Sequence, residues 1–258
     1  MLRFRNLGSG SSGNATIVEA RSAGSVTRLL VDCGLGIRQL EQRMIRAGLA
    51  LTDIDAIFVT HEHSDHIGCA RQVALRHRIP VWMSRGTHAG ARDPDFADLL
   101  RVARDGVEIA LGELSVTPFT VPHDAREPLQ LRCSDGNTRL GILTDLGHAT
   151  DHVLTHLLAC HALLLECNHD PQMLEASSYP LFLKKRVGGP HGHLSNARSA
   201  EIASALSHPG LSTVVAAHLS RENNRPALAQ VALAEALGCK PAHIGVADHE
   251  MGTEWLTV

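Results

Sequence analysis

The segment VTHEHSDHIG (residues 59–68) places three histidines and two carboxylates within six consecutive positions. It continues the apolar run AIFVT (56–60), which predicts a buried strand. Two interpretations are open for such a segment: a solvated loop in which polar residues collect, or one wall of a metal-binding site. A single histidine would favour the loop, but this density of ligand types directly after a strand favours the metal site.

Local geometry within the segment indicates room for two metal ions. His61 and His63 are two residues apart, so their side chains point to the same side of an extended backbone. Ser64 is expected to cap a following helix, which would place Asp65 and His66 in its first turn. The extended pair would serve one ion and the pair at the helix start another, and hydrolytic two-metal sites hold their ions ~3.5–4 Å apart.

Composition places few other limits on the chain. It has 258 residues, 44% of them hydrophobic, and a net charge of -3, so an anionic partner such as nucleic acid would need a local basic patch. No apolar run approaches the ~18 residues of a membrane helix. The start, MLRFRNLGSGSSG, lacks the apolar region of a secretory signal, and the six cysteines are scattered without a CxxC pair. These features favour reduced thiols and a cytoplasmic location. The 17 histidines are the unusual feature.

The order of the predicted elements favours an α/β fold in a single domain spanning residues 1–258. Hairpin-rich blocks alternate with strand–helix units, which two mixed sheets packed face to face with helices on the outer faces would accommodate. Strands are expected at 14–20, 26–32, 56–60, 79–83, 107–111, 113–122, 129–133, 138–144, 162–166, 212–217 and 242–247. Helices are expected at 37–47, 67–78, 151–159, 179–187 and 196–206, with another beginning at Pro226.

Further potential ligands stand where predicted strands end. Asp32, His123, Asp145 and His218 each lie at the end of a different strand, as His61 does. Side chains in such positions can converge on one sheet edge, whereas randomly placed histidines would be spread over faces and helices. A carboxylate such as Asp145 can bridge two cations.

The HEHSDH segment resembles the HxHxDH signature of the metallo-β-lactamase fold, and the four strand-end residues follow in that superfamily's order. The resemblance implies an αβ/βα sandwich and two divalent ions, with zinc or manganese as the expected metals and iron as a further possibility. One ion would be held by His61, His63 and His123, and the other by Asp65, His66 and His218. Asp145 would bridge the ions, and Asp32 would be a support near the site.

A narrower resemblance, running nearly end to end, is to the bacterial YycJ/WalJ-type exonucleases. It rests on the segments LGSGSSGNAT (7–16), VTHEHSDHIG (59–68), VPHDAREP (121–128), TDLGH (144–148), LLLECNHD (163–170), GHLSN (192–196) and AHLSRENN (217–224). The resemblance implies metal-dependent degradation of DNA from 5′ ends, by attack of a hydroxide that bridges the ions. The stretch of sequence between Asp145 and His218 is too short to contain the large inserted cap domain of the RNA-processing branch.

Catalytic and supporting roles remain open for several residues in and around the ligand set. Asp65 and His193 are the expected catalytic residues: His193 would stabilise the phosphate or protonate the leaving oxygen, unless it is a structural turn histidine. Glu166 either orients a ligand or is simply a strand-end carboxylate. Supporting or substrate-binding roles are also expected for His148, His169 and Asn223.

Basic residues near the motifs suggest how DNA would be bound. The cations are Lys184, Lys185, Arg186, Arg198, Arg221 and Arg225. With aromatic residues at 3%, stacking on bases has little to build on, so recognition is expected mainly through backbone phosphates. His152 and His156 share one helix face but lack a third ligand, which favours a solvated face.

Two other functions compete with a DNA exonuclease. One is a small-molecule phosphodiesterase, thioesterase or lactonase of the same fold. The other is a non-catalytic nucleic-acid-binding subunit, against which the complete ligand set argues. The motifs say nothing about protein partners.

Overall fold

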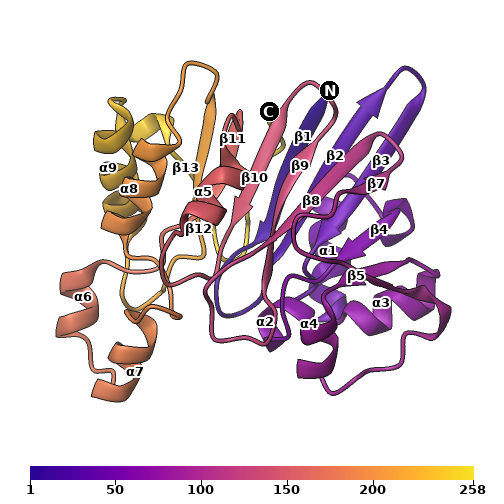
Figure 1. Cartoon of the computed structure of the whole chain (residues 1–258), viewed down its shortest axis with the longest axis horizontal. Coiled ribbons are helices and arrows are strands. Elements are labelled where there is room, and N and C mark those ends of the chain that lie inside the picture. Colours follow the sequence, from indigo (N-terminus) through magenta and orange to yellow (C-terminus); the bar gives the residue numbers. More distant parts are fainter.

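Alternating apolar residues along the strands build two seven-stranded mixed sheets that pack face to face (Figure 1). The computed structural model describes all 258 residues. In the first sheet the strand order is β14 (Leu256–Thr257), β1 (Leu2–Gly8), β2 (Ala15–Ser22), β3 (Ser25–Val31), β4 (Ala56–Phe58), β5 (Val81–Met83) and β6 (Leu100–Val102). In the second it is β13 (Gly245–Val246), β12 (Thr213–Ala217), β11 (Ala162–Glu166), β10 (Arg139–Leu143), β9 (Leu129–Ser134), β8 (Leu114–Thr120) and β7 (Ile109–Leu111).

Each sheet is antiparallel at one end and parallel at the other. Strands β14 to β3 and β7 to β10 pair antiparallel, whereas β3 to β6 and β10 to β13 pair parallel. Because parallel strands in one sheet end at the same edge, residues that follow them come together there. The prediction of two mixed sheets with helices outside is confirmed.

Helices cover the outer faces of both sheets. Figure 1 shows α8 and α9 at one side of the sandwich and α1 and α3 at the other, with α6 and α7 projecting below the second sheet. The helices are α1 (Ile37–Arg46), α2 (Ser64–Ile67), α3 (Ala70–His77), α4 (Arg85–Gly90), α5 (Asp151–Leu157), α6 (Pro171–Ala176), α7 (Leu181–Val187), α8 (Asn196–Ala205) and α9 (Pro226–Leu237). No helix has the length and apolar character needed to cross a membrane.

The period-two pattern of the strands divides the core into three layers. On β2, Val18 packs between the sheets, whereas its neighbour Ile17 faces the layer that contains Leu40 and Met44 of α1. A third layer packs the second sheet against α5, α8 and α9, with Leu163 on the sheet side. Each fully buried aliphatic side chain contributes about 1.5–3 kcal/mol, so these layers hold the strand ends in register.

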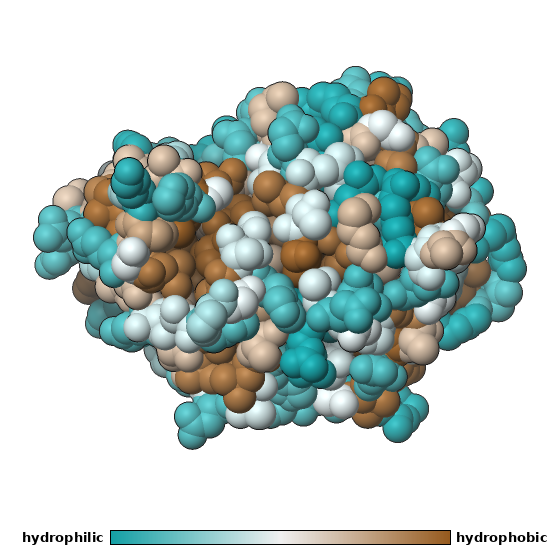
Figure 2. Space-filling view, turned by 90° about the horizontal axis from the view of Figure 1, so that it is seen from above, coloured by the Kyte–Doolittle hydropathy of each residue, from teal (hydrophilic) through white to brown (hydrophobic).

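The surface opposite α6 and α7 is shown in Figure 2, which views the molecule from above. Hydrophilic residues cover most of its margin, and hydrophobic ones gather on the side where α8 and α9 lie in Figure 1. Leu228 and Val231 of α9 are among the exposed apolar side chains of the chain.

A buried carboxylate also joins three strands of the first sheet. Glu19 of β2 accepts hydrogen bonds from Arg3 of β1 at 2.6 Å and from Arg28 of β3 at 2.7 Å, and it pairs with Arg21. Burial alone would raise the pKa of Glu19, but these guanidinium groups outweigh it and lower the pKa to about 2. The carboxylate is therefore ionised and fully paired inside the fold.

Some predicted elements differ in detail. The helix expected at 67–78 is broken between α2 and α3, because Gly68 between them has φ 25°, which is outside the helical range. Only glycine fits at this position, since a Cβ there would lie 2.4 Å from the carbonyl oxygen of Cys33. Ser64 is the first helical residue and provides no side-chain cap; His63 occupies the capping position. The strand expected at 242–247 is reduced to β13, since Pro241–His243 forms a turn of 3₁₀-helix. Elements β1, β6, β14, α4 and α6 were not predicted.

Candidate metal centre

Strand ends from both sheets converge on one site. Asp32 follows β3, Asp145 lies just after β10 and His218 follows β12, and these three residues have left-handed φ angles of 63°, 55° and 53°. A left-handed backbone conformation costs of the order of 1–3 kcal/mol at each non-glycine residue, and it persists where the surrounding packing imposes it. Strain at three converging strand ends is typical of a functional site.

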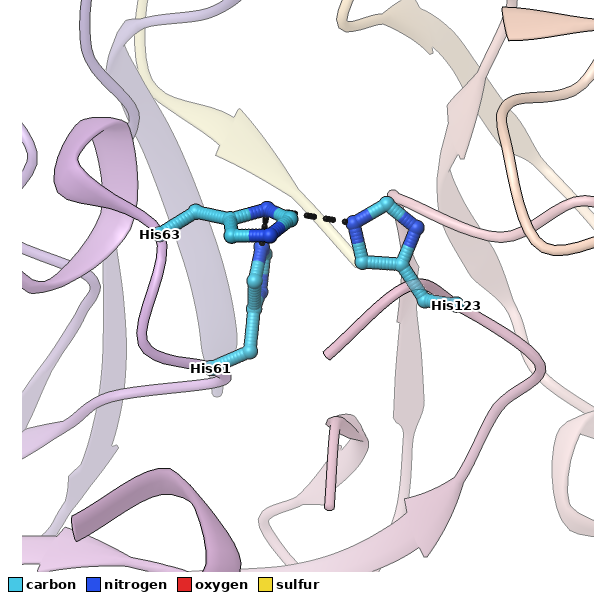
Figure 3. A group of neighbouring side chains, drawn as sticks. All are labelled: His61, His63 and His123. Atoms are coloured by element: carbon cyan, nitrogen blue, oxygen red, sulfur yellow. Dashed lines mark hydrogen bonds between the residues drawn. The ribbon is translucent and has the colours of Figure 1, made fainter. Parts of the chain in front are cut away.

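Three histidines form the first candidate ligand group, and Figure 3 shows His61, His63 and His123 pointing toward one another. The ring of His63 is nearly perpendicular to the other two, at 78° to His61 and 72° to His123. His63 Nδ1 lies 3.1 Å from His61 Nε2 and 3.3 Å from His123 Nε2. Nitrogen atoms brought this close, all inside a radius suited to one cation, are the arrangement that a zinc-type ion requires.

Hydrogen bonds behind these rings select the nitrogen that faces the centre. His123 Nδ1 donates to the carbonyl oxygen of Gly192 at 3.1 Å, and His61 Nδ1 lies 3.0 Å from Thr60 Oγ1. With Nδ1 occupied on both rings, Nε2 presents its lone pair to the centre. Burial, the largest influence on each, lowers the pKa of His61 and His123, which keeps the imidazoles neutral as ligands must be.

The second ligand group lies beside the first and includes the carboxylates. His66 Nε2 is 3.2 Å from Asp145 Oδ2 and 3.6 Å from Asp65 Oδ2, and His218 Nε2 is 3.8 Å from that same Asp65 atom. Asp32 accepts a hydrogen bond from His66 Nδ1 at 2.8 Å, which leaves Nε2 for a ligand role. His61 and His66 also lie within ligand distance of Asp145, so this carboxylate stands between the two groups.

Two buried atoms in this second group have no hydrogen-bond partner: Asp145 Oδ2 and His218 Nε2. Leaving such atoms unpaired is costly, and a shared cation would satisfy both of them. Burial alone would raise the pKa of Asp145, but His218 and His66 outweigh it and hold the pKa well below its ordinary value. The donor set and the unpaired atoms therefore fit divalent metal ions.

Glu166 holds two histidines at once. Its Oε1 accepts hydrogen bonds from His193 Nδ1 at 2.8 Å and from His218 Nδ1 at 3.0 Å. Its Oε2 accepts the backbone N–H groups of Leu146 and Leu194 at 3.1 and 3.2 Å. Burial would raise the pKa of Glu166, but His193 and the other donors lower it to about 2. Glu166 is thus an ionised acceptor that fixes both histidine tautomers.

The cluster opens into a cavity of about 380 Å³. His63, Asp65, Asp145, His193 and His218 line one side of it. The rest of the lining comes from the loop between β1 and β2, from α7 and from three further positions: Ser11, Leu183, Arg186, Val187, Ser64, Asp124 and Gly192. A reacting group of a substrate can therefore reach this cluster from solvent.

The remaining predicted site residues lie at different distances from this cavity. His169 is buried with Nδ1 unpaired, and it shares a neighbouring hollow of about 540 Å³ with His193 and Arg198. His148 is directed to the carbonyl oxygen of Pro190 at 2.9 Å and makes no contact with the cluster. The side chain of Asn223 is buried but forms no hydrogen bond with any site residue. Roles for these three residues stay predictions.

Several residues that touch the ligands escaped the sequence analysis. Asn14 Nδ2 lies 3.0 Å from His66 Nε2, and Thr60 Oγ1 lies 3.0 Å from Asp32 Oδ2. Asp124 Oδ1 lies 3.4 Å from His123 Nε2, and its Oδ2 accepts a hydrogen bond from Arg186 at 2.6 Å. Asn14, Thr60 and Asp124 adjoin or belong to the motifs, but only the fold reveals which side chains turn inward.

Comparison with known proteins identifies the family. The model of the family described as "Beta-lactamase superfamily domain" matches residues 27–219. The chain belongs to the metallo-β-lactamase superfamily. This metallo-β-lactamase-fold protein is 32% identical to Exodeoxyribonuclease YycJ of Bacillus anthracis, over 95% of this chain and 93% of that protein. It is 29% identical to Exodeoxyribonuclease WalJ of Streptococcus pneumoniae serotype 2, over 95% of this chain and 91% of that one.

A solved structure agrees on the fold. The metallo-β-lactamase fold protein YhfI from Bacillus subtilis superimposes with a TM-score of 0.75 at 15% identity, over 99% of this chain and 98% of that one. The predicted membership in the YycJ/WalJ family is confirmed, and the chain is a metal-dependent hydrolase of this superfamily.

Proposed function

We propose that this hydrolase is a DNA exonuclease that works in the 5′-to-3′ direction. The observation that carries the proposal is the nearly full-length similarity to proteins named exodeoxyribonuclease YycJ and WalJ, in a chain whose histidine and aspartate residues meet at an open cavity. The central apolar layer shared by the two sheets supports treating residues 1–258 as one domain.

The ligand assignment follows the two geometric groups. His61, His63 and His123 would hold one ion, Asp65, His66 and His218 the other, and Asp145 would touch both. Nitrogen and carboxylate donors suit zinc or manganese, with iron as a further candidate. Two divalent ions, when bound, supply Lewis acidity and an activated water at neutral pH.

Asp65 and His193 are assigned the proton transfers. Asp65 lines the cavity and remains partly exposed, so its carboxylate is placed to accept a proton from the attacking water. Burial lowers the pKa of His193, but the Glu166 carboxylate outweighs it and raises the pKa. Because His193 Nδ1 donates its hydrogen bond to Glu166, Nε2 is the atom from which His193 would protonate the leaving oxygen or bind the phosphate.

Basic side chains next to the cavity support a phosphate-bearing substrate. Arg186 lines the cavity itself, and Lys184, Lys185 and Arg198 line the hollow that adjoins it at His193. These cations would bind the DNA backbone, with little preference for sequence. Six cysteines without a disulfide support a cytoplasmic location.

The test compares substrates under one set of metal conditions. Linear duplex DNA, a small phosphodiester, a thioester and a lactone are each incubated with the protein and manganese or zinc. The proposal predicts that DNA is cleaved with the highest kcat/KM. A higher kcat/KM for one of the small esters would overturn it, and tight DNA binding without turnover would indicate a binding subunit.

A further inference from the structure

A second group of metal-ligand side chains lies on the surface, away from the centre described above. His152 and His156 are one turn apart on α5, and their ring centroids are 4.6 Å apart. In the sequence they lack a third partner. The fold supplies one: Asp105, 47 residues before His152, places Oδ1 2.9 Å from His152 Nε2. One ligand atom from each of the three residues lies within 4.8 Å of the others.

Neighbouring groups hold two of these side chains in place. Asp105 Oδ1 accepts the backbone N–H of Thr120 at 2.7 Å, which leaves Oδ2 free. Phe119 stacks on the ring of His156, with centroids 5.2 Å apart and planes 8° apart. The carboxylate and one imidazole are therefore positioned before any ion arrives, which lowers the entropic cost of binding.

The protonation states also suit ligation. Burial alone would raise the pKa of Asp105, but the hydrogen bonds from Thr120 and His152 lower it, so the carboxylate is ionised. Burial, followed by the charge of His152, lowers the pKa of His156, so that imidazole is neutral. An ionised carboxylate and a neutral imidazole are the forms that bind transition metals.

We propose that Asp105, His152 and His156 form a surface site for a divalent transition-metal ion such as Zn²⁺. Two histidines at i and i+4 on a helix with a distant carboxylate provide three ligands, and water completes the tetrahedron. Asp105 and His152 are 41% and 42% exposed, so the ion exchanges with solvent. The ion would tie α5 to Asp105 in the segment between β6 and β7. Asp105 accepts the backbone N–H of Thr120 at the end of β8, three residues before His123, so the ion would also support the loop that carries His123.

The test counts bound zinc in the full chain by equilibrium dialysis at a fixed free Zn²⁺ concentration. His152→Ala is compared with wild type, and Thr155→Ala, an exposed change on the same helix, is the matched control. The proposal predicts one ion fewer per chain for His152→Ala and no change for Thr155→Ala, with unchanged hydrolysis when zinc saturates the centre. His156→Asn is a second variant that should reproduce the loss.

A crystal soaked in zinc chloride locates the ion directly. The expected result is an anomalous difference peak among the three side chains in wild type and none in His152→Ala. Equal zinc counts for wild type and both histidine variants, or an equal loss in Thr155→Ala, would overturn the proposal. Circular dichroism before zinc is added separates loss of the ion from loss of the fold.

Discussion

Replacing Glu166 with glutamine should disable the centre without removing any ligand. In wild type, one carboxylate oxygen accepts two backbone N–H groups and the other accepts N–H groups from His193 and His218. A glutamine has only one acceptor oxygen. If that oxygen stays with the backbone, its NH₂ group faces two histidine donors, and if it turns, the NH₂ group faces the two backbone donors.

Relief of this conflict requires a change of tautomer at His218. Its Nδ1 would become an acceptor, so Nε2 would carry the proton and could no longer bind a metal ion. Changes of this kind behind a ligand typically cost 10–100-fold in metal affinity, which corresponds to about 1.4–2.8 kcal/mol. His193 would lose its orientation at the same time, so excess metal should restore activity only in part.

The assay is competition for zinc or manganese against a fluorescent chelator, followed by hydrolysis measured across metal concentrations. The matched control is Glu127→Gln, since Glu127 also accepts a backbone N–H, from Gly86 at 2.7 Å, but takes no part in the cluster. Glu166→Gln should bind the ion assigned to Asp65, His66 and His218 10–100-fold less tightly, and Glu127→Gln should match wild type. Wild-type affinity together with wild-type activity in Glu166→Gln would refute the reasoning.

Two further predictions concern stability. Glu19→Gln should lower the free energy of unfolding by about 2 kcal/mol at pH 7, because it removes a charged acceptor from three arginines. The folded-state pKa of Glu19, about 2, lies below its ordinary 4.5, so its contribution is complete above pH 4.5 and is lost as the pH falls toward 2. Urea unfolding of wild type and Glu19→Gln should show that the difference between their free energies of unfolding shrinks as the pH falls through this range. A difference that does not change with pH would contradict the assigned role of Glu19. Gly34→Ala should destabilise the fold by about 1–3 kcal/mol and weaken metal binding, because a Cβ there would lie 1.6 Å from the carbonyl oxygen of Asp65. Gly36→Ala, whose Cβ meets only Gln39 at 4.0 Å, is the control, and equal melting temperatures for the two variants would count against this packing argument.

The fold and the main ligand candidates were predictable because both depend on local boundaries between apolar and polar residues. A buried strand must end where its polar neighbours begin, so His61, Asp145 and His218 are recognisable as strand-end residues from the sequence. Consecutive apolar residues in a strand, such as Ile17 and Val18, likewise indicate a sheet that is covered on both faces.

Details set by distant contacts were not predictable. Helix 67–78 has a helical pattern, and only the approach of Cys33 to Gly68 explains why it breaks. Glu166 reads as an ordinary strand-end carboxylate until the fold brings two histidines to the same oxygen. Asp105 completes a group with His152 and His156 only because the fold brings the segment between β6 and β7 next to α5.

The central claim is that the histidine–aspartate cluster around Asp145 degrades DNA from its 5′ end. The measurement is degradation of linear duplex DNA labelled at either end, with manganese or zinc, comparing wild type with Asp145→Ala. We expect early release of the 5′ label by wild type and none by Asp145→Ala, because the variant lacks the carboxylate between the two candidate ligand groups. Intact DNA with wild type under every metal condition, or equal degradation by Asp145→Ala, would contradict it.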